Sequence, residues 1–153
     1  MNSTEILSIY EVLFYAYNNN EIKDSNNGLC YLDYDINHDF LIDSTIDGIA
    51  VALSIKREKD SSKPQHGIRR KLALTIIDTT MRCEAHKETL WVNFPKDTYD
   101  NTWLFDLPLK TTDLRAGHNY KLVVTEEKTS RVIGEYVFHL FDKERVGEPS
   151  EWY

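Results

Sequence analysis

Apolar and polar side chains alternate with a period of two residues along most of this chain. Six segments carry the pattern: GIAVALSIKRE at 48–58, RKLALTIID at 70–78, TLWVNF at 89–94, TWLFDLPL at 102–109, YKLVVTEE at 120–127 and RVIGEYVFHLF at 131–141. Such alternation is typical of half-buried antiparallel strands. The last two segments also predict a hairpin that turns about residues 128–130.

The stretches between these segments carry turn residues in place of helical patterns. They are rich in Asn, Asp, Gly, Pro and Ser, which strands reject. None of them offers a helix of about a dozen residues, which disfavours parallel strand–helix–strand units. We therefore expect an all-β protein, an antiparallel β-sandwich of about 7–9 strands. The sandwich domain would span 1–141, and 142–153 would form a C-terminal tail or linker.

The segment TEILSIYEVLFYAY at 4–17 is compatible with two structures. Its apolar residues recur at helical spacing, and Ser3 or Thr4 is available as an N-terminal cap. The same segment is rich in β-branched and aromatic residues, and it places apolar side chains on both faces of a strand. We predict a long strand, with a helix as the alternative.

Composition narrows the class of partner. The 153 residues carry a net charge of −7, from 25 acidic and 18 basic side chains, and this sign disfavours nucleic acid as a partner. We interpret the basic run at 69–71 as a solvated strand end. Aromatic residues make up 12% of the chain, which agrees with a protein built from strands.

The chain shows no targeting segment. Its N-terminus lacks a basic region, Glu11 interrupts the first apolar run, and no stretch is long and apolar enough to span a bilayer. We expect a soluble, cytoplasmic protein without a membrane partner. The two cysteines, Cys30 and Cys83, are then expected to be reduced and buried.

The stretch LRAGHNYKLVV at 114–124 holds a leucine, a glycine turn and a tyrosine that opens an alternating segment. It resembles the tyrosine corner of immunoglobulin-like and fibronectin-type sandwiches. The resemblance implies an immunoglobulin-like sandwich in which the Tyr120 hydroxyl bonds to the backbone within 113–116. The alternative role for Tyr120 is that of a core aromatic residue.

The stretch DYDINHDF at 33–40 places four oxygen-bearing side chains at alternate positions. As an EF-hand loop it fails, because His38 stands where glycine is required and Ser44 where a bidentate glutamate is required. LDYD at 32–35 resembles the third calcium loop of C2 domains, which implies calcium-dependent binding to membranes. The further aspartate of that motif falls on Leu41.

A polar edge strand, or a loop that leaves one, explains the same stretch more simply. The side chains expected to face inward are Tyr34, Ile36, His38 and Phe40, and those expected to face water are Asp33, Asp35, Asn37 and Asp39. Acidic side chains protect a sheet edge against pairing with other chains. We predict no metal site here; cation binding by Asp33, Asp35 and Asp39 stays open as the alternative.

Motifs that carry enzyme chemistry are missing from the sequence. It contains no GxSxG, HExxH, phosphate-binding loop or dinucleotide fingerprint. CEAH at 83–86 is half of a possible zinc site and has no second pair. The five histidines are scattered, at positions 38, 66, 86, 118 and 139. We expect no enzyme activity, no catalytic residue and no cofactor.

Two tryptophans raise a further alternative. Trp91 and Trp103 lie on segments that we predict to be adjacent strands. Sandwiches that bind carbohydrate stack sugars on exposed aromatic side chains, so a carbohydrate-binding module is possible. Core packing explains both tryptophans more simply, because large aromatic side chains dominate β cores.

The C-terminal sequence carries one more resemblance. GEYVFHLFD followed by PSEWY, within 134–153, resembles the junction after an N-terminal sandwich module in some bacterial AAA-type ATPases. This implies an accessory domain of a larger bacterial protein or assembly. We expect a non-catalytic protein-interaction or adaptor module, with an unidentified protein partner bound at a sheet face or edge strand. A C2-like calcium-dependent membrane binder and a carbohydrate-binding module are the alternatives.

Overall fold

The computed structural model describes residues 6–18, 31–34, 39–42, 46–57 and 66–142. This part of the chain contains no helix, and so none that could cross a membrane. Its strands, in chain order, are β1 (Leu7–Tyr17), β2 (Tyr31–Tyr34), β3 (Asp39–Ile42), β4 (Gly48–Arg57), β5 (Ile68–Asp78), β6 (Cys83–Phe94), β7 (Asp100–Pro108), β8 (Asn119–Glu126) and β9 (Arg131–Asp142).

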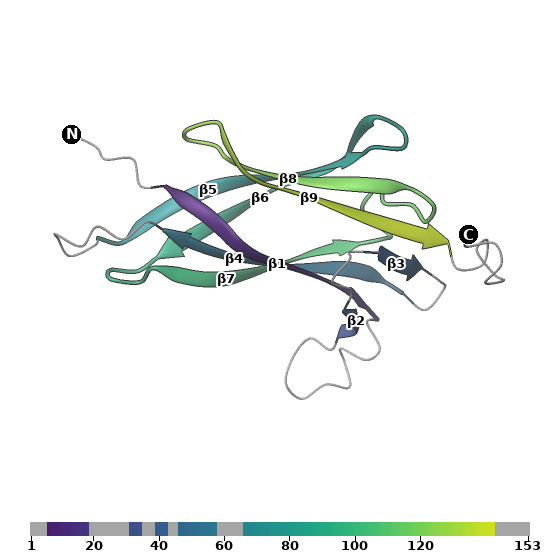
Figure 1. The fold of residues 1–153 in the computed structure, drawn as a ribbon, viewed down its shortest axis with the longest axis horizontal. Coiled ribbons are helices and arrows are strands. Elements are labelled where there is room, and N and C mark those ends of the chain that lie inside the picture. Colours follow the sequence, from purple (N-terminus) through teal and green to yellow (C-terminus); the bar gives the residue numbers. More distant parts are fainter. Residues whose placement is uncertain (1–5, 19–30, 35–38, 43–45, 58–65, 143–153) are drawn as a thin grey trace.

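The strands form two sheets, which Figure 1 shows as two stacked layers. One sheet has the strand order β2-β1-β4-β7, and the other has the order β3-β9-β8-β5-β6. This confirms the prediction of an all-β protein, and the two layers are compatible with a β-sandwich. The prediction of wholly antiparallel sheets is wrong at one place, because β3 and β9 run parallel. Parallel neighbours need a long connection, and most of the chain lies between these two strands.

β1 confirms the predicted N-terminal strand, and the helical alternative is wrong. The strand pairs with β4 along its whole length, from Leu7 opposite Arg57 to Tyr17 opposite Gly48. A β-bulge at Tyr10 interrupts the register. Because the bulge adds one residue, the inward-facing positions change from odd to even numbers along β1. This change spaces the apolar residues in a way that imitates a helical repeat.

The core lies between the two sheets and takes side chains from both. The fully buried residues with the largest side chains are Tyr120, Phe14, Phe40, Phe94, Phe138, Leu7, Ile49, Leu53, Ile55, Leu72, Leu74 and Ile76. The rings of Phe14 on β1 and Phe138 on β9 have centroids 5.1 Å apart, so they join the two layers directly. Burial of this apolar area is the main term that stabilises the fold.

All six alternating segments form strands where the sequence predicts them. The largest difference is in β6, which begins at Cys83 although the alternation predicts a start at 89. β8 and β9 form the predicted hairpin, with Glu126 opposite Arg131. Ser130 in the turn adopts a φ of 56°, in the left-handed region that tight turns use.

The stretch at 33–40 is divided between two strands that join different sheets. β2 forms an edge of the four-stranded sheet and β3 an edge of the five-stranded sheet, so the expected edge position is confirmed and a single continuous strand is wrong. Alternation gives the faces of a strand but not its neighbour, and these two strands pair with β1 and β9. Phe40 is buried, as predicted. Residues 35–38 lie outside the described residues. The absence of a metal site in this stretch stays a prediction, and cation binding by Asp33, Asp35 and Asp39 stays its alternative.

Candidate functional site

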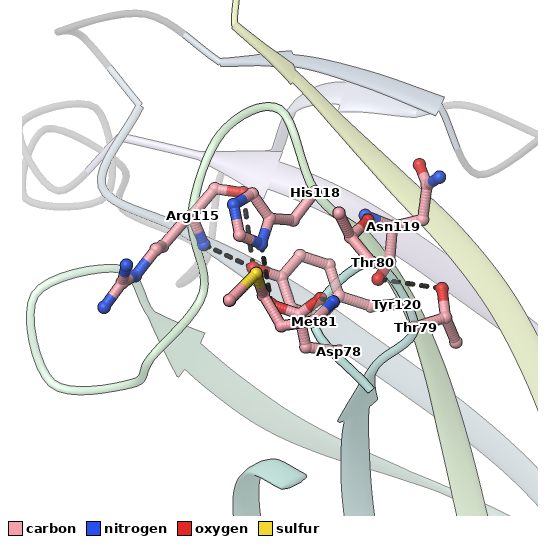
Figure 2. Close-up of polar contacts among 8 residues, drawn as sticks. All are labelled: Asp78, Thr79, Thr80, Met81, Arg115, His118, Asn119 and Tyr120. Atoms are coloured by element: carbon pink, nitrogen blue, oxygen red, sulfur yellow. Dashed lines mark hydrogen bonds and ion pairs between the residues drawn. The ribbon is translucent and has the colours of Figure 1, made fainter. Parts of the chain in front are cut away.

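The tyrosine corner predicted around Tyr120 is present at the start of β8. The Arg115 N–H donates a hydrogen bond to the Tyr120 hydroxyl over 2.6 Å, and that hydroxyl lies 3.3 Å from the Arg115 carbonyl oxygen, to which it donates. Figure 2 shows the phenol directed at this backbone. Tyr120 is also a fully buried core residue, so both roles considered for it hold.

Gly117 allows the chain to turn at this corner. Its φ is 90°, a conformation that residues with a Cβ rarely adopt. The Gly117 N–H donates to the Leu140 carbonyl over 2.6 Å, and the Leu140 N–H donates to the His118 carbonyl over 3.1 Å. These bonds attach the corner to β9.

An acid–imidazole pair, formed by a buried aspartate and a partly exposed histidine, lies beside the corner (Figure 2). Asp78 ends β5 and is only 4% exposed. Its Oδ1 accepts a hydrogen bond from the Met81 N–H over 2.8 Å, and its Oδ2 lies 2.7 Å from His118 Nδ1. The Asn119 N–H donates to the Thr80 hydroxyl over 2.9 Å. The turn between β5 and β6 is thereby joined to the corner.

The surroundings of Asp78 act on its pKa in opposite directions. Burial raises the pKa of the carboxyl, because it disfavours the charged form. Hydrogen bonds from the Met81 N–H, His118 and the Thr80 N–H, together with the charge of His118, lower it by more in sum. The pKa of Asp78 therefore lies below its ordinary value of 3.8.

Asp78→Asn is expected to reduce stability at neutral pH and to flatten the acid limb of the pH–stability curve. Because the folded-state pKa of Asp78 is depressed, its contribution is present above the unfolded-state pKa and is lost as pH falls through the folded-state value. The difference in unfolding free energy between wild type and variant should be largest near about pH 7 and shrink below about pH 4. Urea unfolding across this range measures it; a constant difference would contradict the assignment.

Tyr120→Phe is expected to destabilise the protein by about 1–2 kcal/mol, because it leaves the Arg115 N–H without its buried acceptor. Tyr136→Phe is the matched control. Its hydroxyl has no hydrogen-bond partner among the described residues, so the change should cost less than about 0.5 kcal/mol. Chemical unfolding measures the unfolding free energy of both variants. If the two substitutions cost the same, the hydrogen bonds of the Tyr120 hydroxyl would not stabilise the corner.

The same region contains residue types that are used in catalysis and metal binding. A shallow hollow of about 170 Å³ is lined by Asp78, Met81, Cys83, Glu84, Ala85, Asp113, Arg115 and His118. Cys83 is a free thiol and exposed, so its predicted burial is wrong: it stands at the very start of an edge strand. His86 turns to Glu88, with 2.7 Å between Nε2 and Oε2. Within the described ranges, no three His, Cys, Asp or Glu side chains are placed to hold a metal ion.

The outer face of the four-stranded sheet carries a second hollow, of about 140 Å³. Tyr17 forms one wall and donates a hydrogen bond to Asp106 across β4. Burial raises the pKa of the Tyr17 hydroxyl, and the bond to Asp106 raises it further. Gly48 permits this crossing, since a Cβ there would lie 2.5 Å from Tyr17 Cζ, inside van der Waals contact.

Small side chains on β4 form the floor of this face. Ala50, Ala52 and Ser54 point away from the core and are nevertheless buried, because the flanking strands carry larger residues. Leu104 on β7 forms the opposite wall, and this residue is 51% exposed. The result is an apolar depression beside one exposed leucine.

β7 is an open edge of this sheet. It pairs with β4 from Asp100 opposite Lys56 to Pro108 opposite Gly48, and no other described strand pairs with it. One row of its backbone N–H and C=O groups therefore has no strand partner in the described part of the protein. An edge of this kind can accept an additional strand.

The predictions for the tryptophans and for the basic run hold in part. Trp91 on β6 and Trp103 on β7 lie in different sheets, because the chain changes sheet between these two strands. Trp103 contacts Phe94 edge-on with centroids 5.2 Å apart, as core packing predicts, whereas Trp91 is 46% exposed. The run at 69–71 lies at the start of β5, and Arg69 is exposed there, as predicted for a solvated strand end. Arg70 departs from that prediction, because its side chain is only 15% exposed and pairs with Glu126. The Arg69 guanidinium also lies 4.1 Å above the Trp91 ring.

Sequence reasoning found Tyr120 and missed the pairs Asp78–His118 and Tyr17–Asp106, whose members are far apart in the chain. The one usable signal was the position of Asp78, which continues the inward face of an alternating segment and so needs a buried partner. No protein-family model matches the chain, and no curated protein matches it.

Proposed function

We propose that this protein is a non-catalytic protein-interaction module of immunoglobulin-like topology, which binds an extended segment of a partner at β7 and the adjoining outer face. The observation that carries the proposal is the open edge of β7 next to an apolar hollow walled by Tyr17 and Leu104. Partner backbone would bond to the edge, and alternate partner side chains would fill the hollow.

The strand order supports the immunoglobulin-like assignment. When the strands are lettered in chain order with β2 and β3 set aside, β1-β4-β7 corresponds to A-B-E and β9-β8-β5-β6 to G-F-C-C′. On this lettering β8 is strand F, and the tyrosine corner of these sandwiches lies near the start of strand F. Tyr120 occupies that position and makes the expected bond to Arg115.

The composition of the face supports protein recognition over other uses. Aromatic side chains such as tyrosine are enriched at the apolar centres of protein interfaces, and polar groups such as Asp106 are common at the rim. Leu104 would serve as the anchor, because about half of the residue is exposed beside a depression floored by alanine. The area is small, which fits a peptide segment better than a whole domain.

A displayed library of random peptides, selected on the full chain, provides a partner for the test. Calorimetry should show that the selected peptide binds Leu104→Asp at least about tenfold more weakly than wild type. Val137→Asp is the matched control, because Val137 is 50% exposed on the other sheet, and it should leave the affinity unchanged. Equal weakening by both variants, or the absence of any selectable peptide, would refute the proposal.

We also propose that the module serves a larger assembly. The resemblance within 134–153 to the junction of bacterial AAA-type ATPases supports this idea, although 143–153 lie outside the described residues. The native gene around this chain tests it. An adjoining ATPase domain would support the idea, and an unrelated or absent neighbour would count against it.

A further inference from the structure

Trp91 and Arg69 form an exposed aromatic–cation pair on the five-stranded sheet. Trp91 lies directly opposite Lys71 across β5 and β6, and both side chains point away from the core. The Arg69 guanidinium lies 4.1 Å from the centroid of the Trp91 ring, and Lys71 Nζ lies 5.9 Å from it. A guanidinium stacked on a ring loses few rotamers on binding, so its donors are directed in advance.

The pair stands in a concave surface of positive charge, which we call the Trp91 hollow. This hollow has a volume of about 400 Å³ and is lined by Arg69, Arg70, Lys71, Trp91, Glu127 and Lys128. Its four cations contrast with the net charge of −7 of the whole chain. Such a local reversal of sign concentrates anions at one place on the surface.

Two of the four cations are already engaged within the protein. Arg70 Nε lies 3.3 Å from the buried Glu126, and Lys71 Nζ lies 3.3 Å from Glu127. No described carboxylate lies within ion-pair distance of Arg69 or Lys128. These two cations are therefore available to an external anion, with Trp91 between the strands as an apolar platform.

β6 contributes backbone hydrogen-bonding groups to this surface. It is the edge of its sheet, and β5 is its one hydrogen-bonded neighbour among the described strands. Extended peptides pair with such edges, and their alternate side chains then point to the same face as Trp91. A carboxylate at alternate positions would meet Arg69 and the Trp91 hollow, and a forked guanidinium suits a carboxylate.

We propose that the Trp91 hollow is a second binding site, for an acidic extended peptide segment that adds to the edge of β6. Nucleic acids and anionic membranes also carry negative charge, but they are extended polyanions that the net negative charge of the chain would repel. A peptide presents only a few carboxylates within the reach of the hollow. The site is separate from the β7 face and does not depend on it.

Fluorescence anisotropy on the full chain tests this site with a labelled peptide of about ten residues that has glutamate at alternate positions. Wild type should bind it, and the affinity should fall as salt is added. The same peptide with glutamine in place of glutamate should bind at least about tenfold more weakly. Equal binding of the two peptides, or no binding of the acidic one, would overturn the proposal.

Variants locate the binding on the surface. Arg69→Ala and Trp91→Ala should each lower the affinity for the acidic peptide at least about tenfold. Unchanged melting temperatures would show that both variants remain folded. Lys87→Ala is the control, since it removes one positive charge from the exposed face of β6, the strand that carries Trp91, at a position outside the hollow. If Lys87→Ala lowered the affinity for the peptide as much as Arg69→Ala does, the attraction between peptide and protein would be nonspecific, and the proposal would be overturned. Preferential binding of a single-stranded RNA oligonucleotide or of anionic vesicles would also overturn the proposal.

Discussion

Phe138→Ala is expected to destabilise the protein by about 3–5 kcal/mol, a large part of the stability of a domain of this size. Phe138 is fully buried, and its ring contacts Phe14 of the other sheet at 5.1 Å and Tyr120 of the corner at 5.4 Å. Truncation opens a cavity where the two sheets and the corner meet. Denaturant unfolding measures the loss.

The control for this prediction is the next residue in the chain. Val137 points to the opposite face of β9 and is half exposed, so Val137→Ala should change the unfolding free energy by less than about 0.5 kcal/mol. If Phe138→Ala cost no more than Val137→Ala, the two sheets would not be joined through this residue.

Glu126→Ala is expected to cost about 3–5 kcal/mol, because it leaves a largely buried Arg70 without its carboxylate. The side chains of Glu126 and Arg70 are only 2% and 15% exposed, and the pair faces the interior at one end of the sandwich. Removal of both charges should be far milder. The double variant Arg70→Met with Glu126→Leu is expected to regain most of the loss.

The neighbouring ion pair provides the control. Lys71 and Glu127 are separated by the same 3.3 Å, but both side chains are 39% exposed. Glu127→Ala should therefore cost at most about 1 kcal/mol. Thermal and urea unfolding of the three variants gives the comparison. If Glu126→Ala behaved like Glu127→Ala, the pair at Arg70 would be exposed in solution.

Most of the strands could be predicted from the sequence, because a strand buried on one face has apolar and polar residues at alternate positions. In β4 the residues Ile49, Val51 and Leu53 alternate with smaller ones, and the structure buries the face that carries these three in the core. In β1 the bulge at Tyr10 interrupts this alternation, and for that reason the sequence was compatible with a helix as well as a strand. The bulge depends on how β1 pairs with β4, and the pairing of two strands cannot be predicted from the residue pattern of one segment.

The candidate surfaces were less predictable for the same reason. Tyr120 was identified because its bond to Arg115 is local in the chain. The contact of Arg69 with Trp91, by contrast, depends on the register between β5 and β6. An alternating pattern shows that Trp91 points to one face, but the sheet order decides that this face is open. The assignment of Trp91 and Trp103 to adjacent strands failed at that step.

Residue-resolved amide hydrogen exchange of the full chain tests most directly the claim that β6 and β7 are open edges of a two-sheet protein. β4 lies between β1 and β7, so its amides should exchange slowly throughout the strand. In β7, amides bonded to β4 should be slow and the alternate amides fast, and β6 should show the same alternation against β5. Uniformly slow exchange along β6 and β7 would show that both edges are covered, and it would contradict the basis of both binding proposals.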